Sequence, residues 1–377
     1  MEFHINPSSS SLDVLRGMVL QTWRKTRQTP LEREYHTVLK QIDYIKPSIW
    51  NLYRNNLNAY NFKPPKHKNR AFFKLWEILH RYTLTHQEIK TSTLHLCEAP
   101  GTFVMVINTL FPHVPTLSVS KNGHEPHLTF FPDIQTVPQN EFRYFDVREP
   151  AFFRFLAERG ETYDFITADG GIDEGGCFSQ KEVLHMDLIV AEIAVALLVL
   201  TPGGTFILKT FEWFDSFSIQ WLYILSLSFR SVHVYKPLTS RPTNSERYII
   251  CQDFHGCPPW WTALRAIEVI EYVTQATAQK GTFPAIGDLS IPSITFEHIS
   301  NINKQLIKQQ IKSVKEVLSS IHSQRYLNAQ EAESLKQQAF LEWKRLYHYD
   351  DDLGDTGETH GRLCGDLEGE GGDGLTS

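Results

Sequence analysis

From Thr93 onward the chain alternates short apolar runs with longer amphipathic stretches, and this alternation restricts the possible folds more than any other feature. Apolar strands interleaved with helices predict a parallel sheet that is covered on both faces. The expected helices span 102–111, 149–158, 180–200 and 216–229. The expected strands span 93–98, 116–120, 163–169, 205–211, 231–236 and 247–252.

The last two expected strands are separated by ten residues, PLTSRPTNSE. A parallel connection needs a crossover of about a dozen residues or more, so these two strands are expected to run antiparallel. The predicted fold class is therefore α/β, with a Rossmann-type sheet that is mostly parallel and ends in a C-terminal antiparallel hairpin.

Helical patterns flank the expected sheet on both sides. Residues 11–60, including Leu20 and Trp23, and residues 301–347 have apolar positions at helical spacing, whereas 258–300 are mixed and contain prolines. We expect a helical N-terminal extension over 1–62, a Rossmann-like domain over 63–255 and a mostly helical C-terminal region over 256–349. The glycine-rich, acidic tail over 350–377 is expected to be disordered.

Charge is distributed unevenly along the 377 residues. The tail holds nine acidic residues and one arginine, so the formal charge of −6 leaves the rest of the chain mildly basic, at about +2. This balance permits a polyanionic partner for the body and a basic partner for the tail, although a solubilising end is the simpler explanation for the tail.

Cysteine usage and hydropathy argue against a disulfide-rich, metal-binding, membrane-spanning or secreted protein. The five cysteines form no CxxC pair, so neither a disulfide framework nor a metal site is expected. The longest uncharged stretches, about sixteen residues at 193–208 and fourteen at 216–229, fall short of the roughly 20 that a membrane span needs. The first residues lack a basic segment followed by an apolar run, so no secretory signal is expected.

Two motifs follow expected strands directly. CEAPGTF (97–103) leaves one strand and opens a helix, and TADGG (167–171) places Asp169 at the end of another. Ligands in open α/β sheets bind outside the carboxyl ends of the strands, where the strand order reverses. The small residues Ala99 and Gly101 allow the backbone to approach such a ligand, although each motif alone is also compatible with an ordinary turn.

Two further charged residues belong to the same edge. Lys209 closes the strand in PGGTFILKTF, and Glu246 begins the last strand in SRPTNSERY. Because the last strand is antiparallel, it begins at the edge where the parallel strands end. Asp169, Lys209 and Glu246 are therefore expected to converge, although a lysine at a strand end is by itself most often solvated.

CEAPGTF, TADGG, GGTFILKTF and KPLTSRPTNSERYIIC, in this order between about Asn69 and Cys251, resemble the FtsJ-like methyltransferases, specifically the eukaryotic and viral cap-specific mRNA 2′-O-ribose methyltransferases. The resemblance implies a Rossmann-type methyltransferase sheet and an S-adenosylmethionine-dependent enzyme for mRNA capping that methylates the ribose 2′-hydroxyl of a cap-proximal nucleotide. SRPTNSERY is similar to cap-1 enzymes, which we favour, whereas CEAPG followed by Thr102 is similar to cap-2 enzymes.

The resemblance also implies roles for individual residues. Its Lys-Asp-Lys-Glu tetrad falls on Lys74, Asp169, Lys209 and Glu246. Its S-adenosylmethionine site falls on Asn69, Cys97, Glu98, Ala99, Pro100, Gly101, Thr102, Phe103, Asp146 and Val147. Its RNA contacts fall on Ser179, Gln180 and Asn244. The usual second glycine of PGGF is Thr102 here, which we expect inside the helix, and Asp146 is alternatively the N-cap of the helix that begins near Glu149.

Basic and aromatic residues supply further RNA-binding candidates. The Lys63–Arg70 segment, Lys236, Arg241 and Arg247 are expected to neutralise phosphates. Tyr60, Phe62 or Trp213 would stack on the methylated guanine of a cap, with core packing as the favoured alternative.

Lys209 is expected to act as the general base or as a cation that stabilises the attacking oxygen. Asp169 and Glu246 would raise its pKa, whereas Lys74, a bound sulfonium and burial would lower it, and the sequence leaves this balance open.

The resemblance implies capped mRNA as the partner, with transcription or capping machinery beside it. It implies the nucleus for a cellular protein and the cytoplasm or virion for a viral one. Two alternatives stay open: an rRNA or tRNA 2′-O-methyltransferase, and a non-catalytic RNA-binding subunit built on the same fold. The complete tetrad favours an enzyme.

Overall fold

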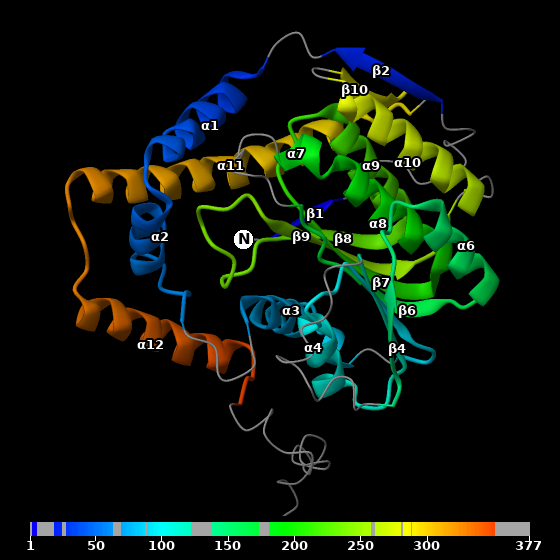
Figure 1. Ribbon diagram of the computed structural model, residues 1–377, viewed down its shortest axis with the longest axis horizontal. Helices are drawn as coiled ribbons and strands as arrows, with labels where there is room; N and C mark the ends of the chain where they lie inside the picture. Colours follow the sequence, from blue (N-terminus) through cyan, green and yellow to red (C-terminus); the bar gives the residue numbers. More distant parts are fainter. Residues whose placement is uncertain are drawn as a thin grey trace, which may run out of the picture.

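The computed structural model describes residues 2–5, 19–24, 28–62, 69–86, 89–121, 138–172, 181–257, 261–279, 282–287 and 289–350. Figure 1 shows a central sheet with helices on both sides and a frame of further helices beside it. The strands are β1 (Glu2–Ile5), β2 (Leu20–Arg24), β3 (Thr93–Leu96), β4 (Thr116–Ser120), β5 (Asn140–Tyr144), β6 (Tyr163–Ala168), β7 (Leu200–Thr210), β8 (Phe229–Tyr235), β9 (Arg247–Phe254) and β10 (Thr282–Ile286).

In the sheet region the helices lie close to the four ranges expected from the sequence. The helices that the structure describes are α1 (Pro30–Lys40), α2 (Pro47–Asn56), α3 (Arg70–Arg81), α4 (Thr102–Leu110), α6 (Pro150–Arg159), α7 (Lys181–Leu184), α8 (Met186–Val199), α9 (Ser216–Ser228), α10 (Ala263–Ala278), α11 (Ser293–His322) and α12 (Ala329–Leu346), with the 3-10 turns η2 (Ile42–Tyr44) and η3 (Leu84–His86). Among the described residues, none of these helices combines the length and apolar character that a bilayer crossing requires.

The main sheet has eight strands in the order β1-β8-β9-β7-β6-β3-β4-β5. Strands β3 to β7 pair in parallel, whereas β9 runs antiparallel to both β7 and β8. The predicted parallel sheet with a C-terminal antiparallel hairpin is confirmed. The chain runs from β3 through β4 to β5 at one edge and then returns to β6 on the other side of β3, so the strand order reverses between β3 and β6.

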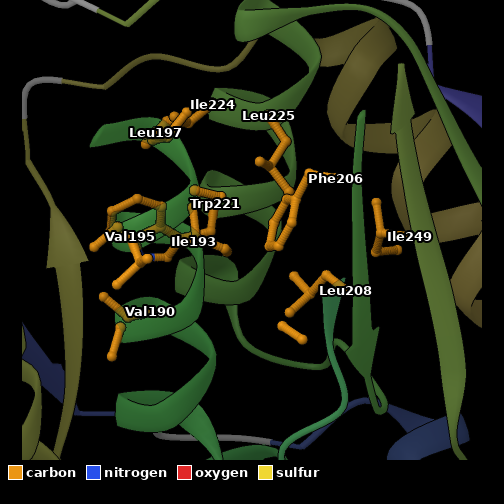
Figure 2. Packing of buried hydrophobic residues seen from close by; sticks show 14 of the residues in the cluster. Val190, Ile193, Val195, Leu197, Phe206, Leu208, Trp221, Ile224, Leu225 and Ile249 are labelled. Carbon is orange, nitrogen blue, oxygen red and sulfur yellow. The ribbon is translucent and has the colours of Figure 1, made fainter. Parts of the chain in front are cut away.

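An apolar layer covers each face of the sheet. Helices α8 and α9 are apolar nearly all round, as buried helices are, and pack against β7 and β9. Figure 2 shows this packing around Ile193, Trp221, Phe206 and Ile249. On the opposite face, Trp76 and its neighbours on α3 pack with residues of α4, β7 and β9 and with α12. Burial of each large apolar side chain contributes roughly 1.5–3 kcal/mol before entropy is counted.

The N-terminal region is less helical than its sequence predicts. Leu20 and Trp23 lie in β2, which pairs antiparallel with β10, and β1 extends the edge of the main sheet beside β8. Both strands find partners that are far away in the chain, and such tertiary pairing overrides a local helical pattern. The mixed 258–300 region contains α10, β10 and the start of α11. The expected disorder beyond Asp350 lies outside the described residues.

The N- and C-terminal helices pack on each other. Helices α1 and α2 bury apolar residues against α11, and Tyr35, Trp50 and Val314 belong to this apolar cluster. Asn56 at the end of α2 is hydrogen-bonded to both backbone groups of Leu327, at 3.0 and 3.1 Å. In Figure 1 helices α2, α11 and α12 frame the loop that joins β8 to β9.

Candidate active site

The turn that leaves β3 lies at the point where the strand order reverses. Cys97 (φ 57°) and Gly101 (φ 99°) both have left-handed backbone, which glycine adopts without strain. Cys97 is held there by its neighbours, because the N–H of Glu98 donates to the Val119 carbonyl at 3.1 Å and that of Ala99 to Ser120 Oγ at 2.7 Å. The turn is therefore fixed by hydrogen bonds to the neighbouring strand.

Thr102 and Asn69 link this turn to α3. Thr102 begins α4 and so lies in the helix, which is the expected position. Its hydroxyl accepts a hydrogen bond of 2.8 Å from Asn69 Nδ2, while Asn69 Oδ1 caps α3 by accepting from the N–H of Ala71 at 2.8 Å. Asn69 thus ties the turn to the helix that carries Lys74.

Glu98 caps the first turn of α4. Its Oε1 accepts from the backbone N–H groups of Phe103 and Val104, at 2.7 and 3.1 Å. Burial raises the pKa of Glu98 to about 8, although these two hydrogen bonds oppose the rise. The Glu98 carboxyl is thus committed to holding the helix start.

Asp146 follows β5 and is held by two cations. Its Oδ1 and Oδ2 accept from Arg148 Nε and Nη2 at 2.9 and 2.7 Å, and Lys121 Nζ lies 3.3 Å from Oδ2. Burial alone would raise the pKa of Asp146, but Arg148 and Lys121 outweigh it and hold the pKa at about 2. The helix cap is Glu149, so the alternative that Asp146 caps this helix is wrong. The side chain of Val147 is buried in the core.

The four side chains of the expected tetrad lie in one place, as two ion pairs. Lys74 Nζ on α3 lies 2.6 Å from Glu246 Oε1, just before β9. Lys209 Nζ on β7 lies 3.2 Å from Asp169 Oδ1, after β6, and donates to the Asp169 carbonyl at 2.5 Å. All four side chains are mostly shielded from solvent.

The two pairs also act on each other electrostatically. Burial lowers the pKa of Lys209, but Asp169, Glu246 and Glu192 together outweigh it, so this pKa is raised above its usual range. Burial raises the pKa of Glu246, but Lys74 and Lys209 hold it far below its usual range. The effect of these acids on the pKa of Lys209 is therefore larger than the effect of burial, and Lys209 is charged at neutral pH.

Two residues beside the tetrad were missed in the sequence. Tyr248 lies opposite Lys209 in the β7–β9 register, and its hydroxyl donates to Asp169 Oδ1 at 2.8 Å. Glu192 on α8 accepts from the N–H of Gly170 at 3.1 Å, and burial raises its pKa to about 8. A Cβ at Gly170 would lie 2.3 Å from Glu192 Oε1, so a larger residue here would displace the Glu192 carboxyl. An acid in the middle of the otherwise apolar α8 was the available signal for Glu192.

Two of the expected phosphate contacts are corrected. Lys236 Nζ donates to the carbonyls of Asn244 and Glu246, both at 2.7 Å, and burial lowers its pKa to about 7. Arg247 is 1% exposed; it donates to Asn303 at 2.9 Å and lies 4.9 Å over the ring of Trp213. Successive strand residues face opposite sides, so Arg247 enters the core while Glu246 faces the site.

The other RNA-binding candidates have mixed outcomes. Phe62 and Trp213 are buried, as the packing alternative predicts, and Tyr60 packs half-buried beside α3. Arg241 is half-buried in the β8–β9 loop, where Asn244 Oδ1 accepts from Lys181 Nζ at 3.2 Å. Ser179, Gln180 and residues 63–68 lie outside the described residues. Within the described ranges, no cluster of His, Cys, Asp and Glu could hold a metal ion.

The sequence of this chain is similar to those of known methyltransferases. Residues 67–254 match the FtsJ-like methyltransferase family. The chain is 31% identical over 196 residues to the cap-specific mRNA (nucleoside-2′-O-)-methyltransferase of Autographa californica nuclear polyhedrosis virus, covering 50% of this chain and 73% of the viral protein.

Eukaryotic relatives also match part of this chain. The identity is 33% over 212 residues with cap-specific mRNA (nucleoside-2′-O-)-methyltransferase 2 of Drosophila melanogaster, covering 50% of this chain. It is 40% over 117 residues with cap-specific mRNA (nucleoside-2′-O-)-methyltransferase 1 of Danio rerio, covering 30% of this chain. The matches span 30% of the insect protein and 14% of the fish protein.

Proposed function

This chain belongs to the FtsJ-like methyltransferase family, and we propose that it transfers a methyl group from S-adenosylmethionine to the ribose 2′-hydroxyl of a cap-proximal nucleotide of mRNA. One observation carries the proposal. The ion pairs Lys74–Glu246 and Lys209–Asp169 meet at the carboxyl edge of the sheet, where ligands of open α/β sheets bind. A family relative without catalytic function would have no need to bury two such pairs side by side.

The residues at this edge fit a methyl donor. Ala99 and Pro100 are half-exposed in the turn after β3 and present backbone to the edge, and Asp146 is ionised at neutral pH. We assign the donor to Asn69, to the Cys97–Phe103 turn, to Asp146 and to the backbone of Val147. When bound, S-adenosylmethionine supplies an electrophilic methyl group on a positively charged sulfur.

Lys209 then acts on the attacking oxygen. The surrounding acids keep its amine charged, so we assign it to stabilising the negative charge that grows on the 2′-oxygen, and the hydroxyl proton leaves to water. Asp169, which accepts a hydrogen bond from Tyr248, orients this amine, and Glu246 orients Lys74. Placing both reactants in register contributes roughly 7–11 kcal/mol to lowering the barrier, to which the fixed charges add.

We further propose the first transcribed nucleotide as the target. The support is the SRPTNSERY block (240–248), which resembles the cap-1 enzymes and supplies both Glu246 and Arg241. Two of the relatives are named as enzymes 1 and 2 of cap methylation, so identity alone does not choose between them.

The test is transfer of a labelled methyl group to RNA carrying cap-0, RNA carrying cap-1 and uncapped RNA. We expect transfer to cap-0 RNA, little transfer to the other two, and a loss of at least about 100-fold in Lys209→Ala. Lys40→Ala, which removes an exposed lysine at the end of α1, is the control. Near-normal transfer by Lys209→Ala would remove Lys209 from the reaction, and equal transfer to uncapped RNA would refute cap specificity.

A further inference from the structure

The segment that follows β6 is held to helix α8 at two points. Residues 169–172 come directly after the strand, and two of their amides donate to side chains at α8. The N–H of Gly170 donates to Glu192 Oε1 at 3.1 Å, and that of Ile172 donates to His185 Nε2 at 2.9 Å. His185 is the N-cap of α8 and Glu192 lies about two helical turns later, so both side chains leave the same face of the helix.

The second hydrogen bond of His185 determines which ring nitrogen carries the proton. Nδ1 lies 2.8 Å from the carbonyl oxygen of Lys181, and because a carbonyl can only accept, Nδ1 is the donor. Nε2 is then an acceptor, which is what the N–H of Ile172 requires. Burial lowers the pKa of His185 and so favours the neutral ring, which packs on Phe211 with 4.3 Å between the ring centroids.

Glu192 is difficult to explain as a residue that stabilises the fold. Its side chain is 1% exposed in the apolar middle of α8, and its Oε2 is buried without a hydrogen-bond partner among the residues that the structure describes. A buried polar atom without a partner costs free energy. Sequences break such rules chiefly at functional sites. The contact of Glu192 with Gly170 leads directly to such a site.

The same segment fixes the amine of Lys209. Lys209 Nζ donates to the backbone carbonyl of Asp169 at 2.5 Å and lies 3.2 Å from Asp169 Oδ1. A Cβ on Gly171 would lie 3.6 Å from Lys209 Nζ, so the amine lies directly against this stretch of backbone. A shift of residues 169–172 would therefore move both groups of Asp169 that hold the amine.

We propose that His185 and Glu192 are positioning residues for Lys209, and that they act by holding residues 169–172 against α8. The inference rests on the proposed function, because it gives both residues a task in methyl transfer. They act through the backbone of Gly170 and Ile172 and not on the reacting atoms. A fixed charge stabilises the transition state only when it is correctly placed. A displaced amine therefore slows the reaction without changing how tightly either substrate is bound.

The first experiment measures kcat and KM for methyl transfer to cap-0 RNA. Glu192→Leu and His185→Leu remove the acceptors, and each should lower kcat about 10- to 100-fold while the KM values for RNA and S-adenosylmethionine stay within about twofold. Glu192→Gln keeps an oxygen for the N–H of Gly170, so its kcat should stay within about threefold of the unmodified chain. A rise in KM at unchanged kcat, or a fall in Glu192→Gln as large as in Glu192→Leu, would overturn the proposal.

A second variant disturbs the same contact from the other side. Gly170→Ala would place a Cβ 2.3 Å from Glu192 Oε1 and displace the carboxyl without changing α8, and it should lower kcat as Glu192→Leu does. Gln220→Leu is the matched control, because Gln220 is buried on α9 and holds both backbone groups of Ile286 on β10, at 2.8 and 2.9 Å. It should destabilise the fold in denaturant and leave kcat within about twofold.

Combination with Lys209→Ala separates positioning from general damage to the fold. If Glu192 acts through Lys209, Glu192→Leu should cost less than about threefold in kcat once the amine is absent. Damage to the fold would cost the same factor in both backgrounds, and that result would overturn the proposal.

The failure of this proposal can be told apart from the failure of the proposed function. If the unmodified chain methylates no RNA, the proposed function fails, and the role of His185 and Glu192 in the reaction fails with it. If the chain methylates capped RNA but Glu192→Leu, His185→Leu and Gly170→Ala all leave kcat within about twofold, the proposed function stands and the positioning role fails.

Discussion

Replacing Glu77 is expected to damage both the stability and the activity of this protein. Glu77 lies on α3, one turn after Lys74, and its side chain is fully buried. Its Oε1 accepts from the hydroxyl of Tyr235 at 2.5 Å and from the N–H of Leu238 at 2.6 Å. Its Oε2 accepts from the hydroxyl of Thr239 and from Trp343 Nε1, both at 3.1 Å. One carboxyl thus joins α3, β8, the β8–β9 loop and α12.

The cost of each substitution follows from these donors. Glu77→Ala leaves all of them without an acceptor in the core and also opens a cavity, so we expect a loss of about 3–5 kcal/mol in the free energy of unfolding. Glu77→Gln keeps the volume and one oxygen. Its amide is best placed where Oε1 was, because the hydroxyls of Tyr235 and Tyr347 can both turn away from this position, and then the N–H of Leu238 loses its acceptor. That single loss costs about 1–3 kcal/mol.

Denaturant unfolding measures the effect on stability, with the exposed Glu271→Gln on α10 as the control, expected within about 0.5 kcal/mol of the unmodified chain. Burial raises the pKa of Glu77, so the unmodified chain gains stability relative to Glu77→Gln as falling pH protonates this carboxyl, and the penalty of Glu77→Gln should grow there. The rate of methyl transfer should fall in Glu77→Gln, because the loop that supplies Glu246 loses an anchor. A Glu77→Ala variant within about 1 kcal/mol of the unmodified chain would refute this reasoning.

Two further predictions concern pH. The raised pKa keeps the Lys209 amine charged, which is the form that the proposed role needs, so the single-turnover rate should not rise tenfold per pH unit between about pH 6 and 9. A tenfold rise per pH unit would show instead that the amine must first lose its proton. Burial raises the folded pKa of Glu192 to about 8, so the stability from its protonated form is fully present below an unfolded pKa near 4.5 and is lost as pH rises toward 8. The free energy of unfolding of Glu192→Gln should therefore equal that of the unmodified chain near pH 4.5 and exceed it at higher pH, by up to about 1.4 kcal/mol per pH unit. Free energies of unfolding that change in parallel from pH 4.5 to 8 would contradict this.

Strand direction made the centre of the site predictable. The loop between β8 and β9, residues 236–246, is too short for a parallel crossover, so β9 runs antiparallel and Glu246 lies at the edge where β6 and β7 end. That inference needs no knowledge of side-chain packing, and Glu246 lies with Lys74 at 2.6 Å as a result. Local hydropathy likewise predicts α8 and α9, because both are long and apolar.

Other features depend on partners that are distant in the chain. The pairing of β2 with β10 and of β1 with β8 cannot be deduced from the sequence of β1 or β2 alone, and β5 is too polar to stand out as a strand. Arg247 is a different case, because strand alternation already places it on the face opposite Glu246. The charge of Arg247 alone indicated an RNA contact, whereas its position in the strand places its side chain in the core.

The β8–β9 loop shows why the matched region cannot be treated as the whole site. Lys236 holds the end of this loop through two of its carbonyls, and Glu77 holds its beginning. Trp343 of α12 shares the Glu77 carboxyl. The position of Glu246 therefore depends on a helix that lies outside residues 67–254, so the C-terminal region contributes to the geometry of the candidate active site.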